Sequence, residues 1–322
     1  MDTTFTIIGL DRVGISLGLA LKKADDGFVC TGFDFEAFRR DEAARLKAVD
    51  KTEADLHPSV RNADVVLLNV PAGDVIAWLD ELMPELKDDA VLVNLSAAHN
   101  AVCEWAAAHL PAHRTVVNAT PSIQGNCLSN DDPTADLFRE GLVLVSTPSG
   151  TGEQAIQQVE MLSEILGSTV MFSDPLEADG LLSQIDLFPR LAMLLYLRSI
   201  TGQPGWKDAR KITGPVFWQA AQILGMFPVG KLASQEITYQ RENTLRMLEM
   251  LREQIDRLQE EIQSDEAAVL EKSLQKTLED HDAWVKQRIE GSWDGKGKGD
   301  DEVKSAGIWK KLLGISLPQK KK

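Results

Sequence analysis

The sequence predicts an α/β protein in which a doubly wound parallel sheet is followed by an all-helical region. Short apolar runs alternate with amphipathic stretches as far as about residue 173, and this alternation is typical of a parallel sheet covered by helices. Beyond that point the apolar residues recur with helical spacing only. The chain has 322 residues, 43% of them hydrophobic, which is enough for two domains.

The first apolar run ends in a glycine turn. The stretch TFTIIGLDRVGISLG changes from strand spacing to helical spacing across Gly9. Gly14 lets the following helix pack close to the strand, and the N–H groups at Arg12 and Val13 then face a ligand phosphate. Asp11 replaces the middle glycine of G-x-G-x-x-G, and like charges about 4 Å apart cost roughly 4 kcal/mol at an effective dielectric of about 20. The turn therefore predicts a Rossmann-type nucleotide fold, with Asp11 opposing cofactor binding.

A second feature of that fold lies about 20 residues further on. Asp34 follows the run FVCTGF, at the spacing of a carboxylate that accepts hydrogen bonds from an adenine-side ribose. This position favours NAD over NADP, although Arg39 and Arg40 soften the preference; the alternative is an ordinary turn residue. Val70 and Pro71 end a later strand and are expected to line the same cofactor site.

The remaining elements follow in regular order. After the second strand (28–36) we expect helices at 37–49, 73–86, 100–109 and 151–166, and strands at 63–71, 90–96, 114–121, 142–147 and 168–173. Ligands of such a sheet bind at the carboxyl ends of the strands. Segments 69–71, 94–99 and 118–122 are therefore expected to line one crevice.

The second half of the chain reads as helices. Segments 175–200, 206–224 and 230–290 have helical spacing, and from Leu245 the apolar residues step by three and four in a heptad-like seam. Such a pair of long helices is typical of packing or dimerisation. We therefore predict a nucleotide-binding domain at 1–173, a helical substrate and dimerisation domain at 174–290, and a flexible basic tail at 291–322.

Charge and composition exclude several classes of protein. The formal net charge of −15 argues against non-specific binding to nucleic acid. The cysteines Cys30, Cys103 and Cys127 lie far apart, and neither they nor the histidines show a metal-ligand pattern. Without a signal segment or a run of 18 apolar residues, we expect a cytoplasmic protein with no stable membrane insertion. The tail carries eight lysines, and residues 308–313 could form a short amphipathic helix that touches a membrane or the protein itself.

The ordered set of motifs resembles the prephenate and arogenate dehydrogenase family of tyrosine biosynthesis. The resemblance includes IIGLDRVGISLGLALK, ADVVLLNVP, AVLVNLSAAHNAV and TVVNATPSIQG in the first half, and ADGLLSQIDLFPRLAMLL and GWKDARKITG in the second. It implies a Rossmann domain followed by a helical domain that forms a homodimer. It also implies NAD(P)-dependent oxidative decarboxylation of a small anionic acid, with a base that accepts the hydroxyl proton.

The residues that the family uses for this chemistry are altered here. Its His-Pro pair corresponds to Thr120-Pro121, and its Ser-His-Leu-Pro-His pattern corresponds to residues 186–190, DLFPR. Arg210 matches the substrate-binding arginine. A rebuilt catalytic set would use His99, Asp186 as base, Arg190 and Arg210 for the anionic substrate, and Thr120 to orient the ligand.

Plainer interpretations stand beside these roles. Asp186 and Arg190 are four residues apart and could form a simple helix ion pair, and His99 could start a helix or lie on the surface. Two functions therefore remain open: an NAD(P)-dependent dehydrogenase with a rebuilt site, and a catalytically inactive nucleotide- or ligand-binding homologue with a sensing role.

Overall fold

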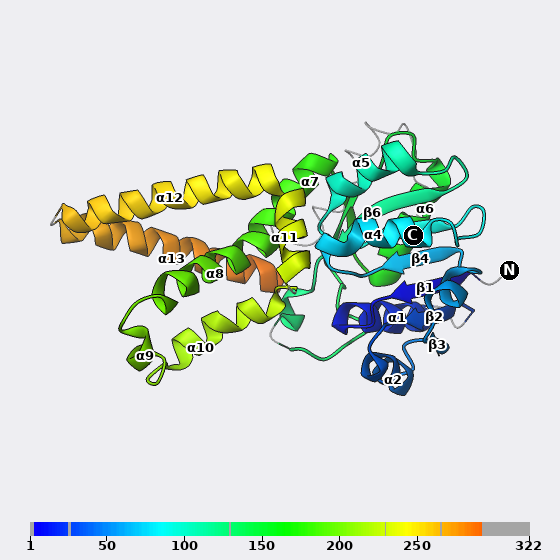
Figure 1. Cartoon of the computed structure of the whole chain (residues 1–322), viewed down its shortest axis with the longest axis horizontal. Helices are drawn as coiled ribbons and strands as arrows, with labels where there is room; N and C mark the ends of the chain where they lie inside the picture. The colour runs from blue at the N-terminus through cyan, green and yellow to red at the C-terminus, as the bar shows by residue number, and fades with distance from the viewer. Residues whose placement is uncertain (1–2, 25–26, 129, 229, 265, 292–322) are drawn as a thin grey trace, which may run out of the picture. The chain divides into compact units, whose positions relative to one another are not determined.

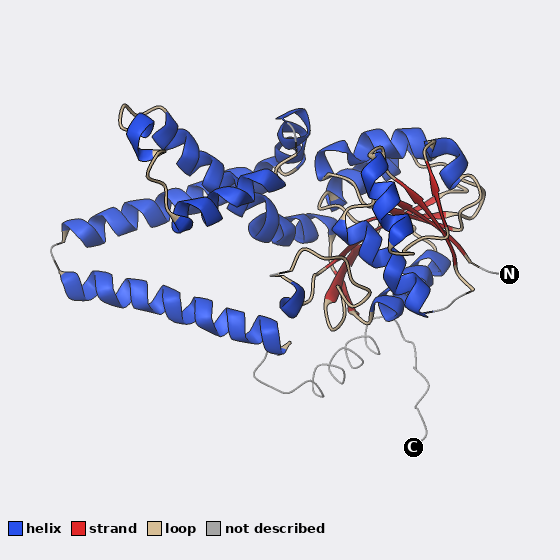
Figure 2. Ribbon diagram, turned by 90° about the horizontal axis from the view of Figure 1, so that it is seen from below, coloured by secondary structure: helices blue, strands red, loops and turns tan. Residues whose placement is uncertain are grey.

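An eight-stranded sheet forms the first part of the protein (Figures 1 and 2). The structure is a computed structural model, and it describes residues 3–24, 27–128, 130–228, 230–264 and 266–291. The strand order is β3-β2-β1-β4-β5-β6-β7-β8, so strands are added on one side of β1 up to β3 and on its other side from β4 onward. Figure 2 shows helices on both faces of the sheet. The α/β fold class, with a helical region after the sheet, is confirmed.

The strands and the helices between them have the following bounds. The strands are β1 Thr4–Ile8, β2 Val29–Phe33, β3 Lys51–Glu53, β4 Val65–Leu68, β5 Val91–Asn94, β6 Thr115–Pro121, β7 Leu142–Ser146 and β8 Thr169–Phe172. The helices are α1 Arg12–Ala24, α2 Ala37–Arg45, α3 Leu56–Val60, η1 Ala72–Asp74, α4 Val75–Leu82, α5 His99–His109, η2 Gly125–Cys127 and α6 Glu153–Leu166. The short elements β3 and α3 are additions to the predicted set.

The apolar runs of the sequence form the centre of the sheet. Strands β4 and β5 are buried along their whole length, as expected for a sheet covered on both faces. On one face, the core is built by α4 and α5, which contribute Trp78, Leu79, Val102 and Trp105. The register of the neighbouring strands pairs Ile8 with Leu68, so β1 and β4 end at the same level.

One strand departs from the predicted parallel sheet. Strand β7 runs antiparallel to β6, with Thr120 paired to Leu144. A parallel return needs a crossover, usually a helix, whereas the described residues between β6 and β7 contain only the single turn η2. The prediction of an entirely parallel sheet was therefore wrong at this one strand.

The second part of the protein is helical, as predicted. Its elements are α7 Pro175–Leu182, a π-helical turn η3 Ser183–Leu187, α8 Phe188–Thr201, α9 Trp206–Ala209, α10 Pro215–Gln222, η4 Ile223–Met226, α11 Gly230–Tyr239, α12 Arg241–Gln263 and α13 Ala267–Glu290. Within the described residues, the continuous stretch Pro175–Thr201 is long and apolar enough by composition to cross a membrane, although core helices meet the same criterion. The sequence search for apolar runs did not single it out.

The chain packs into two compact units. The first contains residues 1–123 and 131–257, and thus the sheet together with α7 to α11 and most of α12. The second contains residues 124–130 and the chain from Leu258 onward. The predicted boundary between residues 173 and 174 marks the change from strands to helices rather than a boundary between these units. The predicted basic tail lies, except for Gly291, outside the described residues.

Candidate functional site

A cleft opens at the carboxyl ends of β1, β4 and β5. Its volume is about 460 Å³, and all of its lining residues belong to the first compact unit. They are Asp11, Arg39, Asn69, Val70, Pro71, Ala72, Ser96, Ala97, Asp186, Arg190, Met226, Phe227, Pro228 and Glu236. Larger hollows of about 910 and 790 Å³ lie against α5, but this cleft stands where the strand order reverses, which is where such sheets bind ligands.

The glycine turn shapes one wall of the cleft. Gly9 has φ +90°, and a side chain there would lie 1.9 Å from the carbonyl oxygen of Asn69. A side chain on Gly14 would lie 1.9 Å from the carbonyl oxygen of Gly9, so α1 packs directly against the end of β1. Only glycine fits either position, and the close approach of helix to strand that the sequence indicates at Gly14 is present.

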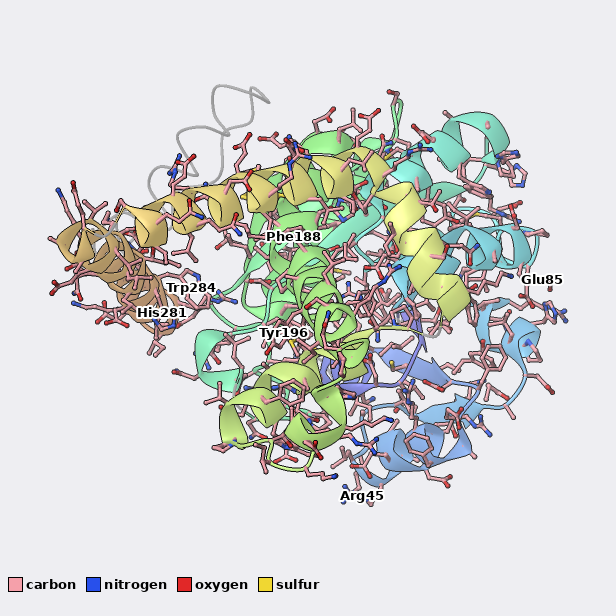
Figure 3. All side chains as sticks on the ribbon, turned by 60° about the vertical axis from the view of Figure 1, so that its left-hand side comes forward. Arg45, Glu85, Phe188, Tyr196, His281 and Trp284 are labelled. Carbon is pink, nitrogen blue, oxygen red and sulfur yellow. The ribbon has the colours of Figure 1, made fainter. Side chains whose placement is uncertain are left out.

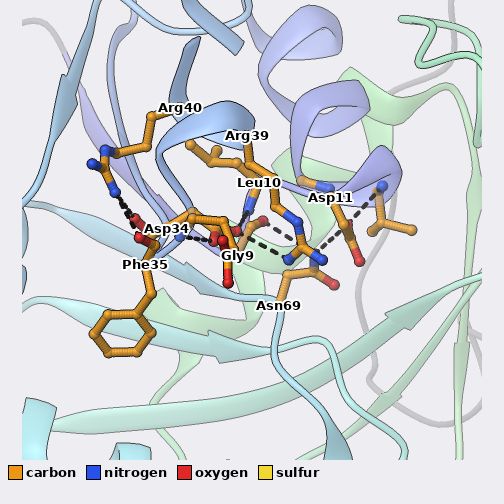
Figure 4. Close-up of polar contacts among 11 residues, drawn as sticks. Gly9, Leu10, Asp11, Asp34, Phe35, Arg39, Arg40 and Asn69 are labelled. Carbon is orange, nitrogen blue, oxygen red and sulfur yellow. Dashed lines mark hydrogen bonds and ion pairs between the residues drawn. The ribbon is translucent and has the colours of Figure 1, made fainter. Parts of the chain in front are cut away.

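Asp11 occupies the N-terminus of α1 (Figure 4). Its Oδ1 accepts hydrogen bonds from the N–H groups of Val13 and Gly14 at 2.9 and 3.1 Å. The Asn69 side chain donates a third hydrogen bond at 2.7 Å. This is the geometry of an N-cap, and it uses N–H groups of the kind that bind phosphate in nucleotide folds. The Asp11 carboxylate therefore bonds the N–H groups at the start of α1 itself, in addition to repelling a ligand phosphate there.

Asp34 is buried at the end of β2 and already has several partners. Its Oδ2 accepts hydrogen bonds from the Leu10 N–H at 2.8 Å and from Arg39 at 3.3 Å, while Oδ1 accepts one from the Glu36 N–H at 2.9 Å. Arg40 instead donates to the carbonyl oxygens of Asp34 and Phe35 (Figure 4). Asp34 thus fixes the turn and neutralises Arg39, which agrees with its interpretation as a turn residue, whereas its contact with a cofactor ribose stays a prediction.

A buried ion cluster forms the opposite wall. Arg190 donates to both oxygens of Glu236, at 3.1 Å from Nη1 and 2.6 Å from Nη2. The side chains of this pair are only 6% and 5% exposed, and Phe227 lies 5.0 Å from the guanidinium. Arg190 also donates to the backbone carbonyl of Asp186 at 3.1 Å and to its carboxylate at 2.5 Å. The predicted helix ion pair is present, and Glu236 is a partner that sequence reasoning missed.

Local helix geometry positions Asp186. It lies in the π-helical turn η3, between α7 and α8, and Pro189 sits at the start of α8, where its missing N–H is not needed. The Asp186 side chain is 58% exposed and lines the cleft. Among the described residues only Arg190 bonds to its carboxylate, through Oδ2, which leaves Oδ1 available to a ligand.

His99 lies in the core and not in the cleft. It is fully buried at the start of α5, with Nε2 2.9 Å from the Thr120 hydroxyl and Nδ1 2.9 Å from the Ser146 hydroxyl. Burial lowers the pKa of the imidazole to about 3, so the ring is neutral at ordinary pH. The hydroxyl of Thr120 also donates to the carbonyl oxygen of Leu95 or Ser96. His99 and Thr120 therefore belong to a neutral hydrogen-bond network outside the cleft lining, and this placement does not support their predicted catalytic roles.

Asp179 fixes the start of α5 from the helical side. Its carboxylate accepts hydrogen bonds from the N–H groups of His99 at 2.7 Å and Asn100 at 3.1 Å. Burial raises the pKa of this carboxyl to about 6, despite these bonds. Nearby, Gln240 donates to the carbonyl oxygen of Ala97 at 2.8 Å and accepts from Ser183 at 3.0 Å. These contacts join α7 and the α11–α12 junction to the strand ends.

The structure does not bring Arg210 to the cleft. Arg210 follows α9, is exposed, and is absent from the cleft lining. Segment 118–122 is absent as well, because Asn118 is buried and donates to the His99 carbonyl oxygen and the Ser146 hydroxyl. Of the predicted catalytic residues, only Asp186 and Arg190 therefore meet at the cleft; of the predicted cofactor residues, Asp11, Val70 and Pro71 line it.

The glycine turn, the sheet order and the cleft define a Rossmann-type nucleotide-fold protein with a helical second layer. Residues 17–172 match the family model described as prephenate dehydrogenase, nucleotide-binding domain. The cyclohexadienyl dehydrogenase of Zymomonas mobilis is 26% identical over 196 residues, which cover 61% of this chain and 67% of that protein. The prephenate dehydrogenase of Bacillus subtilis is 24% identical over 193 residues, covering 59% of this chain and only 52% of that one.

The fold is shared with a solved structure over most of its length. The prephenate dehydrogenase from A. aeolicus, in complex with hydroxyphenyl propionate and NAD+, superposes with a TM-score of 0.72 at 16% identity. The match covers 87% of this chain and 97% of that one. Residues 17–172 are thus similar in sequence to the nucleotide-binding domain of prephenate dehydrogenases, and the chain shares its fold with a solved prephenate dehydrogenase.

Proposed function

We propose that the chain is an NAD(P)-dependent oxidoreductase of prephenate dehydrogenase type that acts on a small carboxylic acid. The observation that carries this proposal is the cleft itself, because it joins the glycine turn of a nucleotide fold to a polar wall on α8 and α11. The match of residues 17–172 to the nucleotide-binding domain of prephenate dehydrogenases and the NAD+ complex of the A. aeolicus protein support it.

The residues fit a dinucleotide on one condition. Gly9 and Gly14 leave room for a phosphate beside α1, but Asp11 must first release the N–H groups of Val13 and Gly14. When bound, the nicotinamide would accept a hydride from the substrate. We propose that NAD+ binds in preference to NADP+, because Asp34 neutralises Arg39 and leaves a carboxylate next to any 2′-phosphate.

The chain's own groups would hold and orient the acid. Arg190 is committed to Glu236, so it positions the wall rather than acting as a free anion receptor. Asp186 is the exposed carboxylate on the substrate side and therefore the candidate to contact the substrate. Arg210 keeps its proposed carboxylate-binding role only if a partner or a rearrangement of the helices supplies it.

A second function is favoured by a specific observation. Asp11 occupies the N–H groups of Val13 and Gly14 that a phosphate would need, and His99 is buried in the core with the half-buried Thr120 as a partner. A non-catalytic homologue that binds a ligand in the cleft would have the same features.

Calorimetric titration of the full chain with NAD+ and NADP+ separates the two functions. We expect binding of NAD+, stronger binding by the Asp11→Gly variant, and unchanged binding by the exposed control Asp41→Asn. Reduction of NAD+ on addition of prephenate or arogenate would establish the enzyme. Binding without reduction would favour the sensor, and no binding at millimolar nucleotide would eliminate the dehydrogenase.

We also propose a homodimer formed through the helical region. Large apolar side chains are exposed there, including Tyr196 on α8 and Trp284 on α13, both labelled in Figure 3, and Trp218 on α10. Leu258 and Ile262 of the predicted seam are exposed as well. Sedimentation of the full chain should give twice the mass of 35.4 kDa, and a monomer at micromolar concentration would contradict the proposal.

A further inference from the structure

We propose that Asn69 is a positioning residue that controls nucleotide affinity, because it holds the Asp11 carboxylate on the N–H groups that a pyrophosphate would need. The inference rests on the proposed function and names the side chain that limits nucleotide binding in the same cleft. Both residues line that cleft.

The Asp11 carboxylate is held through one of its two oxygens (Figure 4). Oδ1 accepts hydrogen bonds from the N–H groups of Val13 and Gly14 at 2.9 and 3.1 Å, and from Asn69 Nδ2 at 2.7 Å. No hydrogen bond from the described part of the chain reaches Oδ2. The Asn69 bond is the shortest of the three and the one that a side chain donates. Asp11 can therefore leave α1 only by breaking its bond with Asn69.

Asn69 is itself fixed by the end of the neighbouring strand. Its backbone N–H donates to the carbonyl oxygen of Ile8 at 2.9 Å, and its Nδ2 donates to the carbonyl oxygen of Gly9 at 3.1 Å. The same Nδ2 would lie 3.4 Å from a side chain on Gly14, so the glycine leaves room for the amide. Because backbone atoms already orient this amide, it is preorganised to hold Asp11.

A ligand pyrophosphate and the Asp11 carboxylate compete for the same N–H groups. While Asp11 bonds them, the start of α1 is closed to phosphate, and each donor to Asp11 favours this closed state. The apparent affinity for a nucleotide is lowered in proportion to the fraction of molecules in the open state. Loss of the Asn69 donor should therefore raise both the open fraction and the affinity.

Calorimetric titration of the full chain with NAD+ tests this in a double-mutant cycle. Asn69→Ala should bind NAD+ about tenfold more tightly than the native chain, the effect of one hydrogen bond to a charged group. In the Asp11→Gly background the same substitution should give no gain, because Asn69 acts through Asp11. Asn62→Ala, which changes an exposed asparagine before β4, is the matched control and should leave the affinity unchanged.

A second measurement needs no nucleotide. Asp11 protects the N–H groups of Val13 and Gly14, so their hydrogen exchange should be faster in Asn69→Ala and unchanged in Asn62→Ala. Mass spectrometry of the peptide that contains the start of α1 measures the exchange. Asn69→Leu, which has a similar volume and no donor, takes the place of Asn69→Ala if that variant does not fold.

Three results would overturn the inference while the proposed function stands. They are unchanged or weaker binding of NAD+ by Asn69→Ala, an equal gain in the native and Asp11→Gly backgrounds, and unchanged exchange at Val13 and Gly14. Failure of the proposed function looks different, because then neither the native chain nor any variant binds NAD+. That result would overturn both.

Discussion

Two polar clusters, one in the core around His99 and one at the cleft around Arg190, satisfy their groups in opposite ways. Around His99, a neutral imidazole is surrounded by hydroxyls and carbonyls, and no charge is buried on the ring. Around Arg190, a full ion pair is buried and extended to the cleft by Asp186. The neutral cluster therefore stabilises the fold, whereas the ionic cluster places charged side chains in the cleft wall. Of the catalytic residues predicted from the sequence, His99 and Thr120 lie in the neutral cluster, and Asp186 and Arg190 lie in the ionic cluster.

The ionic cluster should be the more fragile of the two. We expect Glu236→Gln to lower the free energy of unfolding by about 3 kcal/mol, because it leaves a buried guanidinium without its bidentate partner. Urea unfolding at pH 7 measures the change. The control Glu249→Gln breaks an exposed pair with Arg252 and should cost less than about 1 kcal/mol. Equal stability of the two variants would show that Asp186 alone suffices for Arg190.

The next largest loss of stability is expected at Gly73, where two backbones lie in close contact. A side chain on Gly73 would lie 2.0 Å from the carbonyl oxygen of Leu232 in α11, the helix that carries Glu236. We expect Gly73→Ala to cost about 2–3 kcal/mol, since two backbones must move apart. Gly202→Ala, with nothing within 4 Å of the new atom, is the control. Thermal unfolding of both variants tests this, and similar melting temperatures would mean that α11 yields freely.

The stability of the protein should depend on pH through His99 and through Asp179, whose carboxylate accepts a hydrogen bond from the His99 N–H group. The pKa of His99 is lowered from 6.5 to about 3, so its contribution is present above pH 6.5 and is lost as the pH falls toward 3. The pKa of Asp179 is raised from 3.8 to about 6, so its contribution is present below pH 3.8 and is lost as the pH rises through 6. Each slope approaches about 1.4 kcal/mol per pH unit, and the two oppose each other between about pH 4 and 6.

Removing one group should expose the slope of the other. Asp179→Asn should lose stability more steeply than the native chain on acidification from pH 6 to 4, and His99→Gln should lose it less steeply. Urea unfolding at pH 4.5, 5.5 and 6.5 measures these slopes. Parallel curves for all three proteins would contradict the assignment of either pKa.

The smallest effect is expected at Asp11, beside the glycine turn. Asp11→Ala should lower the free energy of unfolding by about 1 kcal/mol, the usual cost of losing an N-cap. Asp11→Asn, which keeps an acceptor oxygen, should cost less. Chemical unfolding of the two variants distinguishes them, and an unchanged Asp11→Ala variant would mean that the contacts with Val13 and Gly14 do not stabilise α1.

The sequence predicts the fold well because the fold depends on local patterns. Apolar runs and glycines mark β1, β4 and β5 and the turn into α1, where side-chain size alone decides what fits. The antiparallel β7 was missed because strand direction depends on what the connection does in space. In the site, the pairing of Asp186 with Arg190 follows from helical spacing.

Long-range partners account for the residues that sequence reasoning placed wrongly or overlooked. Glu236 lies 46 residues from Arg190, and nothing in its own helix marks it as the partner. His99 follows a strand end that was expected to face the crevice, but Thr120 and Ser146 from two other strands enclose it. Its protonation and exposure could be known only after those strands were placed.

The glycine contact between η1 and α11 couples the two walls mechanically. Because no side chain separates Gly73 from the α11 backbone, a displacement of α11 passes directly to the loop that follows β4. That loop carries Val70 and Pro71, while α11 carries Glu236. A displacement of the wall that carries Glu236 should thus reach the wall that carries Val70 and Pro71 directly, through one backbone contact.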